Sequence, residues 1–147
     1  MANTHRLTAL IEKEGNGYVA LCPELDIASQ SLTIEESQRT LKEALELFLR
    51  EADTSEVEGR LHSDVYVTGS RLWLGRLRVL SGRAVCRILA NHGFFEVRRH
   101  GSHIIMQLRK EDSTVTVPVP DHDELLVGTP RSVIRQSGLP RTLFETT

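Results

Sequence analysis

The spacing of hydrophobic positions predicts β-strands in the first part of the chain. Three short segments have this character, at 7–12, 18–22 and 27–31. The first two flank Glu14-Gly15-Asn16-Gly17, where Asn and Gly tolerate the positive φ of a hairpin turn. An alternating segment at 64–68 predicts one more strand.

A helical period begins at residue 34. Thr33-Ile34-Glu35-Glu36 is a capping box, in which the Thr33 hydroxyl accepts from the third helical N–H and Glu36 reaches back. The apolar stripe of this helix consists of Ile34, Leu41, Ala44, Leu45, Phe48 and Leu49. We expect the helix to fade in 53–56.

The second half begins and ends with a predicted helix. Ser81 is the predicted N-cap of the first, which His92-Gly93 ends. Strands follow at 94–98, 104–108 and 114–118. Thr129 as N-cap and Pro130 as first helical residue then predict a last helix that closes on Gly138.

The predicted order is βββαβ, a linker, and αβββα. Because the strands arrive as meanders, this order predicts an α+β protein of two small domains. We place them at 1–68 and 79–147, with a linker at 69–78. The αβββα order with arginines beside the strands is that of a dsRBD-like fold, which reads A-form RNA.

Charge divides the chain at the same place. Residues 1–69 hold 6 Lys and Arg against 13 Asp and Glu, whereas residues 70–147 hold 12 against 7. Eleven of the twelve cations in the second half are Arg, whose planar fork suits phosphate. This asymmetry indicates an anion-binding module and an acidic module that covers it. Two solvated surfaces would give the same counts.

Composition limits the class of protein. The chain has 147 residues, 39% hydrophobic and 26% charged, which is typical of a soluble globular protein. No run is long and apolar enough for a membrane span, and no signal sequence begins the chain, so we expect no membrane partner. Cys22 and Cys86 are too few for a disulfide scaffold, so we expect free thiols and a cytoplasmic location.

Several blocks of the second half together resemble the HicA toxins. They are Ser81-Gly82-Arg83, His92-Gly93-Phe94, Val97 to His103 with Gly101-Ser102-His103, Thr114 to Pro118, and Gly128-Thr129-Pro130-Arg131-Ser132 continuing to Leu139. The first half is similar to the HicB antitoxins, through Gly17-Tyr18-Val19-Ala20, Cys22-Pro23-Glu24-Leu25 and Thr33 to Ser37. The HicB resemblance implies a partial RNase-H-like fold that acts as an inhibitor of the toxin.

The HicA resemblance implies a ribonuclease that cleaves mRNA, with His103 as catalytic residue and no cofactor. A neutral imidazole can take the proton of a ribose 2′-hydroxyl, and an imidazolium can donate to the leaving 5′-oxygen. The residues expected to bind RNA are Arg98, Arg99, Gly101, Ser102, Lys110, Arg131 and Arg135. Of these, Gly101 and Ser102 are expected to bring backbone N–H groups near a phosphate.

Other residues of the sequence could support a metal site or a different nucleophile. His100 to His103 with Asp121-His122-Asp123 is a conceivable zinc or magnesium site, but no helical His pair or Cys pair supports a metal. Ser102 and His103 are adjacent, so in a strand they point to opposite faces and do not form a nucleophile–base pair. Among the acidic residues of the first half, Glu35 and Glu36 are explained by helix capping.

The sequence therefore predicts a fused toxin–antitoxin protein in which the acidic domain masks a basic ribonuclease. The expected partners are mRNA and the other domain, within one chain or between the chains of a homo-oligomer. The chain departs from the HicB pattern because it shows no DNA-binding segment, so we do not expect it to bind DNA alone. Two alternatives stay open: a catalytically silent RNA-binding module, and an interaction protein that neutralises a separate toxin.

Overall fold

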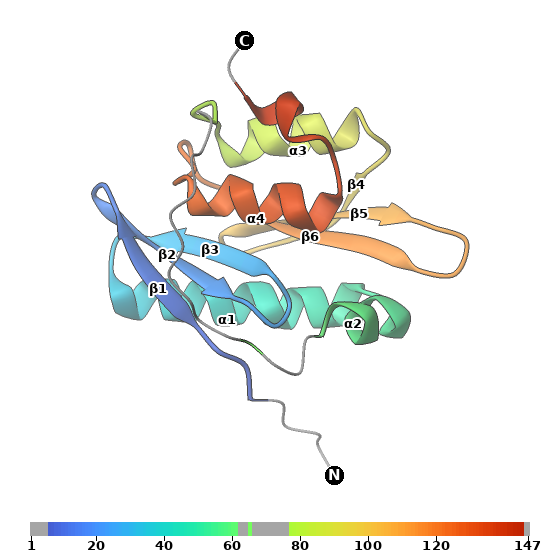
Figure 1. Ribbon diagram of the computed structural model, residues 1–147, viewed down its shortest axis with the longest axis horizontal. Helices are drawn as coiled ribbons and strands as arrows, with labels where there is room; N and C mark the ends of the chain where they lie inside the picture. The colour runs from blue at the N-terminus through green and yellow to red at the C-terminus, as the bar shows by residue number, and fades with distance from the viewer. Residues whose placement is uncertain (1–5, 62–64, 66–76, 146–147) are drawn as a thin grey trace.

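The computed structural model describes residues 6–61, 65 and 77–145. The fold is α+β, as predicted, with two antiparallel sheets of three strands each (Figure 1). The predicted strand at 64–68 and most of the predicted linker lie outside the described residues.

The first sheet is a meander with the strand order β1-β2-β3. Its strands are β1 (Leu10–Glu14), β2 (Gly17–Cys22) and β3 (Ile27–Ser31). Helix α1 (Ile34–Glu51) packs on β2 and β3. The Thr33 hydroxyl accepts from the backbone N–H of Glu36, as the capping box predicts, whereas the Glu36 carboxylate lies beside Arg39 instead of reaching back.

One prediction for this region is wrong, and one element was not predicted. Helix α1 ends at Glu51, close to the predicted end at 53–56, but the chain then forms a second helix, α2 (Thr54–Arg60). The buried face of α1 is also displaced from the predicted stripe, because Ile34 and Leu49 are about half exposed. Its buried residues are Ser37, Thr40, Leu41, Ala44, Leu47 and Phe48.

The second half has the predicted order αβββα. It comprises α3 (Gly82–Ala90), β4 (Phe95–His100), β5 (His103–Arg109), β6 (Thr114–Pro120) and α4 (Gly128–Ser137), followed by a 3-10 turn (Arg141–Phe144). The Ser81 hydroxyl caps α3, as predicted. Gly138 ends α4 with a φ of 68°.

The predicted cap of α4 is wrong. The helix begins at Gly128, two residues earlier than expected, and Val127 stands at its N-cap without a side-chain bond. The hydroxyl of Thr129 instead donates to Gln30 Oε1 in the first half, at 2.9 Å. The Thr129 hydroxyl, which the local sequence assigns to helix capping, therefore bonds to a residue that is distant in the sequence.

Each half has its own hydrophobic core. One cluster centres on Ala20, Ile27, Leu41 and Phe48, and the other is drawn from residues between Leu77 and Phe144. Leu77 and Arg78, which the prediction assigns to the linker, bond to the C-terminal turn through Glu145 and Phe144. Separate cores are what two small domains require.

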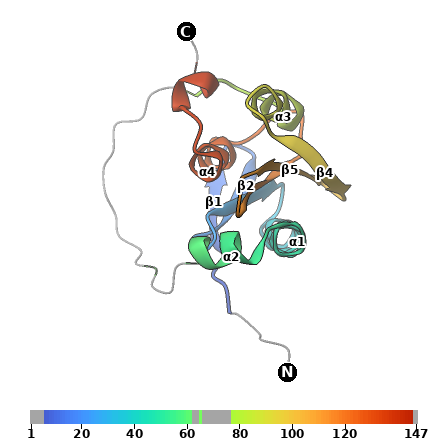
Figure 2. The same ribbon diagram turned by 90° about the vertical axis from the view of Figure 1, so that its right-hand side faces the viewer.

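The halves nevertheless lie against each other along most of their length. Helices α1 and α2 lie along the bottom of Figure 1 and α3 along the top, with both sheets and α4 between them (Figures 1 and 2). Helix α4 packs against β6 of its own half and β3 of the first half, and α1 contacts β5 and β6. Strand β3 is therefore covered on both faces, and all five of its residues are buried.

Candidate functional site

His103, the predicted catalytic residue, lies at the start of β5 directly after the tight turn at Gly101 and Ser102. Its side chain is fully buried. The cover comes from the first half of the chain, since Ser29 Oγ on β3 shares a 2.9 Å hydrogen bond with His103 Nε2. On the other side of the ring, Glu43 Oε2 on α1 lies 3.5 Å from Nδ1.

Burial has an electrostatic consequence for this imidazole. Loss of hydration, with a smaller contribution from the charge of His122, lowers the pKa of His103 to about 4. Glu43 would attract an imidazolium, but loss of hydration outweighs it. His103 is therefore neutral at pH 7, the form that accepts a proton.

The turn before His103 is occupied by the same carboxylate. Gly101 has a φ of 57°, and a Cβ placed there would lie 1.8 Å from Glu43 Oε1. The Ser102 hydroxyl lies 3.5 Å from Glu43 Oε2. Gly101 and Ser102 thus face an anion, although the anion is a carboxylate of the same chain.

Two of the predicted RNA-binding arginines are paired across the halves. Arg98 on β4 forms an ion pair with Glu51 at the end of α1. Arg135 on α4 binds both oxygens of Asp26 through bonds of 2.8–3.0 Å. Both arginine side chains remain about half exposed, so each pair is open to solvent.

The other predicted cations differ in their surroundings. Arg99 contacts Glu96 and Asp121 of its own half. Lys110 is exposed, next to the turn between β5 and β6. Arg131 has a buried Nε without a hydrogen-bond partner and lines a small cavity with Arg135, Glu12 and Glu14. The predicted cations are thus spread over β4, the turn between β5 and β6, and α4.

Residues 82–139 match the family model for the HicA toxin of bacterial toxin–antitoxin systems. This segment runs from the start of α3 to just beyond α4 and contains every predicted site residue. The chain carries a HicA toxin domain. The match begins at Gly82, so the likeness of residues 1–68 to the HicB antitoxins stays a prediction.

A second comparison gives a curated relative. A UPF0150 protein of Helicobacter pylori (strain J99 / ATCC 700824) is 42% identical over 52 residues, which span 35% of this chain and 72% of that protein. The chain therefore also belongs to the UPF0150 protein family. No solved structure matches it.

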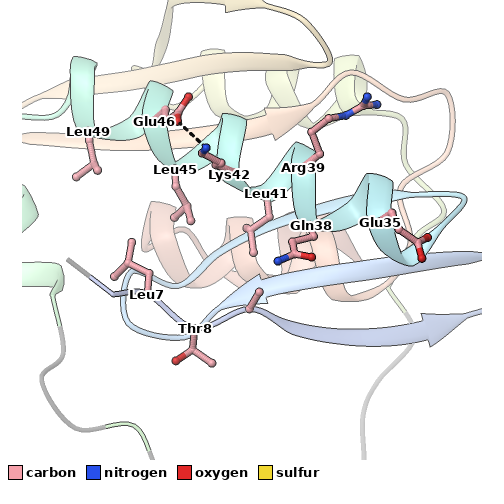
Figure 3. A pocket seen from close by; sticks show the side chains of 11 residues that line it. Leu7, Thr8, Glu35, Gln38, Arg39, Leu41, Lys42, Leu45, Glu46 and Leu49 are labelled. Atoms are coloured by element: carbon pink, nitrogen blue, oxygen red, sulfur yellow. Dashed lines mark ion pairs between the residues drawn. The ribbon is translucent and has the colours of Figure 1, made fainter. Parts of the chain in front are cut away.

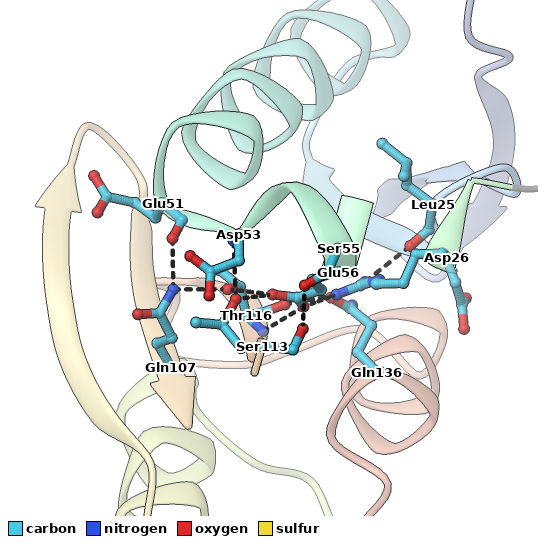
Figure 4. A network of polar contacts seen from close by, with 12 residues as sticks. Leu25, Asp26, Glu51, Asp53, Ser55, Glu56, Gln107, Ser113, Thr116 and Gln136 are labelled. Atoms are coloured by element: carbon cyan, nitrogen blue, oxygen red, sulfur yellow. Dashed lines mark hydrogen bonds and ion pairs between the residues drawn. The ribbon is translucent and has the colours of Figure 1, made fainter. Parts of the chain in front are cut away.

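The strongest contact between the HicA domain and the first half was missed at the sequence level. Glu56 on α2 is buried and accepts from Thr114 Oγ1 at 2.5 Å and from Thr116 N and Oγ1 at 2.6 and 2.8 Å (Figure 4). Arg60, one turn later, pairs with Glu56 at 3.0 Å and stacks over the Phe48 ring. Glu56 and Arg60, two charged residues of one short helix, thus bind α2 to β6.

Arg60 extends this network to both sides. Its guanidinium donates to the Leu25 carbonyl, the Thr116 carbonyl and Gln136 Oε1, each at 2.8–2.9 Å (Figure 4). Gln30 makes a second polar connection, bonding to the Glu124 carbonyl, the Leu126 N–H and the Thr129 hydroxyl. The acidic excess of the first half predicted that this half would present negative charge to the second half. It did not predict which residues make the contacts.

A groove on the far side of α1 lies apart from these contacts. It has a volume of about 570 Å³ and runs between residues 7–9 and α1, with Leu41, Leu45 and Leu49 on its wall (Figure 3). None of the predicted site residues lines it.

Three further observations concern metals, thiols and membranes. Within 6–61, 65 and 77–145, no three His, Cys, Asp or Glu side chains gather as a metal site would require. Cys22 and Cys86 are free thiols, as predicted, and burial raises the pKa of each to about 12. No helix of the described segments is long and apolar enough to cross a membrane.

Proposed function

We propose that this chain joins a ribonuclease toxin and its inhibitor in one polypeptide. The HicA domain cleaves mRNA through His103, and residues 1–68 hold that domain inactive. The observation that carries the proposal is the complete burial of His103 under Ser29 and Glu43. RNA cannot reach the imidazole while these residues cover it.

The chemistry of the cover supports inhibition by imitation of the substrate. Ser29 offers a hydroxyl to His103 Nε2, as the ribose 2′-hydroxyl would during cleavage. Glu43 brings a carboxylate to Gly101 and Ser102, where a phosphate is expected to bind. The cover thus supplies the two functional groups that define the RNA substrate, without a bond to cleave.

Charge supports the same arrangement at longer range. Asp26 and Glu51 neutralise Arg135 and Arg98, two residues predicted to contact phosphates. An RNA backbone would have to displace these carboxylates. Complementary charge of this kind sets orientation and partner choice more than affinity.

The test compares four proteins in an RNA cleavage assay. They are the intact chain, an opened chain, a charge-matched control and the fragment 77–147, which contains the complete second core. The opened chain carries Asp26→Asn, Glu51→Lys and Glu56→Lys, all in the first half. Asn is chosen at position 26 because Asp26 has a φ of 54°, which Asn tolerates. The control carries Glu35→Gln, Glu46→Lys and Glu58→Lys, at exposed positions.

We expect the opened chain and the fragment to cleave RNA, and the intact chain and the control to be nearly inactive. Breaking one buried ion pair costs about 3–5 kcal/mol. This is enough to shift the equilibrium between the closed and the opened chain by about 100-fold or more. His103→Gln should abolish cleavage in the opened chain but leave RNA binding, and EDTA should have no effect because imidazole alone performs the proposed reaction. Equal cleavage by intact chain and fragment would refute inhibition. RNA binding without cleavage by every form would indicate a silent RNA-binding module instead.

A further inference from the structure

A second histidine lies on the same side of the HicA sheet as His103. In the ladder between β5 and β6, His103 stands opposite Pro120, the last residue of β6. The chain continues in the same direction, since the Asp121 N–H donates to the Ser102 carbonyl at 2.7 Å. Residues two apart in an extended strand face the same side, so His122 is a diagonal neighbour of His103.

The backbone of His122 is fixed from its own domain. The Gly82 N–H at the start of α3 donates to the His122 carbonyl at 2.8 Å. A Cβ at Gly82 would lie 1.9 Å from the Pro120 carbonyl, so this close approach requires glycine. No side-chain hydrogen bond joins the His122 ring to another residue within the described part of the chain. The position of His122 is thus set while its ring stays available.

The ring faces the covered site. A cleft of about 340 Å³ separates the halves, with Gly101, Ser102 and His122 on the HicA side. The opposite wall is formed by Gln30, Ser31, Glu36, Arg39, Thr40 and Glu43. His122 and Glu124 also line an adjoining cavity with Gln30 and Glu36. When the first half moves away, His122 is left beside the turn that is expected to hold the phosphate.

We propose that His122 is the second catalytic histidine of the HicA domain and acts as general acid opposite His103. This inference rests on the proposed ribonuclease function. His103 takes the proton of the 2′-hydroxyl as the 2′-oxygen forms its bond to phosphorus. The bond from phosphorus to the 5′-oxygen breaks, and the His122 imidazolium gives that oxygen its proton. The products are a 2′,3′-cyclic phosphate and a 5′-hydroxyl, with one proton accepted and one donated.

The two environments suit these two roles. His103 is held neutral by burial, so it begins as the acceptor. His122 is half-buried in a cleft that also carries Glu36, Glu43, Glu124 and Arg39. His122 also contributes to the lowered pKa of His103, as expected for neighbouring imidazoles. General acid catalysis and general base catalysis each accelerate such a reaction by about 10²–10⁴-fold.

His100 is the rival for this role and provides the matched control. It stands opposite His103 in the β4–β5 ladder, so it is as close along the sheet. It is exposed, however, and does not line the cleft. We therefore expect His100→Ala to retain cleavage.

The test uses the full-length opened chain and two short oligonucleotides that differ at one atom. One has the natural 5′-oxygen at the scissile phosphate, and the other has sulfur, which leaves without a proton from an acid. His122→Ala should slow cleavage of the oxygen substrate by about 10²-fold or more and restore it on the sulfur substrate. His103→Ala should be slow on both.

The outcomes separate the two proposals. If the opened chain with both histidines cleaves neither substrate, the ribonuclease function itself is wrong. If it cleaves both and His122→Ala is unimpaired, or is slowed equally on oxygen and sulfur, His122 is not the general acid. Sulfur rescue in His122→Ala but not in His103→Ala supports the assignment.

Discussion

The hydroxyl of Ser29 lies 2.9 Å from Nε2 of His103, although the two residues are 74 positions apart. This contact joins the middle of β3 to the start of β5 and lies wholly inside the protein. A hydroxyl at this place gives the buried imidazole nitrogen a hydrogen-bond partner and, at the same time, blocks access to it. On the proposed function, the stability of the closed chain and the inhibition of its toxin domain are coupled through one hydrogen bond.

Ser29→Ala should loosen this cover. The substitution leaves His103 Nε2 buried without a partner, which costs about 1–3 kcal/mol. We expect a lower free energy of unfolding in urea and faster RNA cleavage by the intact chain. Ser31→Ala is the matched control, because the Ser31 hydroxyl donates to the Thr33 carbonyl within its own half. If both variants behave alike, the Ser29 hydroxyl has no special part in closure.

Acid should weaken the closed chain through His103. The pKa of His103 falls from 6.5 to about 4 on burial, so between these values the unfolded or opened chain binds more protons than the closed one. Stability is therefore complete above pH 6.5 and is lost as the pH falls toward 4, by on the order of 3 kcal/mol.

The measurement is the free energy of unfolding of the intact chain at several pH values between 7.5 and 4.5. His103→Gln keeps an amide able to bond with Ser29 but removes the titration, so the difference between variant and parent should change across this range. Carboxylates titrate in both proteins and cancel. Two curves that remain parallel would show that His103 does not titrate between the two states.

Glu56 should contribute more to closure than any exposed ion pair. Glu56→Ala removes four bonds and leaves Arg60 buried without its carboxylate, which costs about 3–5 kcal/mol. Arg135→Ala, which removes an exposed pair, should cost about 1 kcal/mol or less. Denaturation of both variants, with Glu58→Ala as a control on the exposed face of α2, measures the difference. An effect of Glu56→Ala no larger than that of Glu58→Ala would contradict this account.

The fold was predictable where local signals agree with tertiary packing. Thr33, Ser81 and Gly138 cap or end helices as the sequence predicts, and both meanders lie where hydrophobic patterns and turn residues place them. These features depend on neighbours within a few residues. Local chemistry therefore specifies the order of these elements.

Features created by the contact between the halves were not predictable in this way. Thr40 on α1 is buried on the side that faces the second half, whereas Leu49 remains half exposed. Helix α2 has no apolar stripe, and its single buried residue is the charged Glu56. A charged anchor cannot be distinguished from a solvated residue until its partners Thr114 and Thr116 are known.

The candidate site shows the same limit. The HicA resemblance singled out His103 and the turn before it, yet Ser29 and Glu43 carried no signal of their own. Ser29 lies in a weak polar strand, and Glu43 lies on a helix position that the pattern assigns to solvent. Their part in the site follows from the contact of α1 with β5 and of β3 with β6, the strand next to β5.

Cutting the chain between the halves should not by itself release the toxin domain. With a protease site placed within 66–76, cleavage removes the covalent tether, which contributes an effective concentration on the order of millimolar. The buried contacts of Glu56, Arg60 and Gln30 do not depend on the tether, so we expect the nicked halves to stay together and inactive at low salt. High salt at about 1 M screens the exposed pairs Asp26–Arg135 and Glu51–Arg98 but not the buried ones. Dissociation should therefore require both salt and dilution, with RNA cleavage appearing as the halves separate on a sizing column. If the nicked protein cleaves at low salt as fast as the fragment 77–147, the tether and not the interface maintains inhibition.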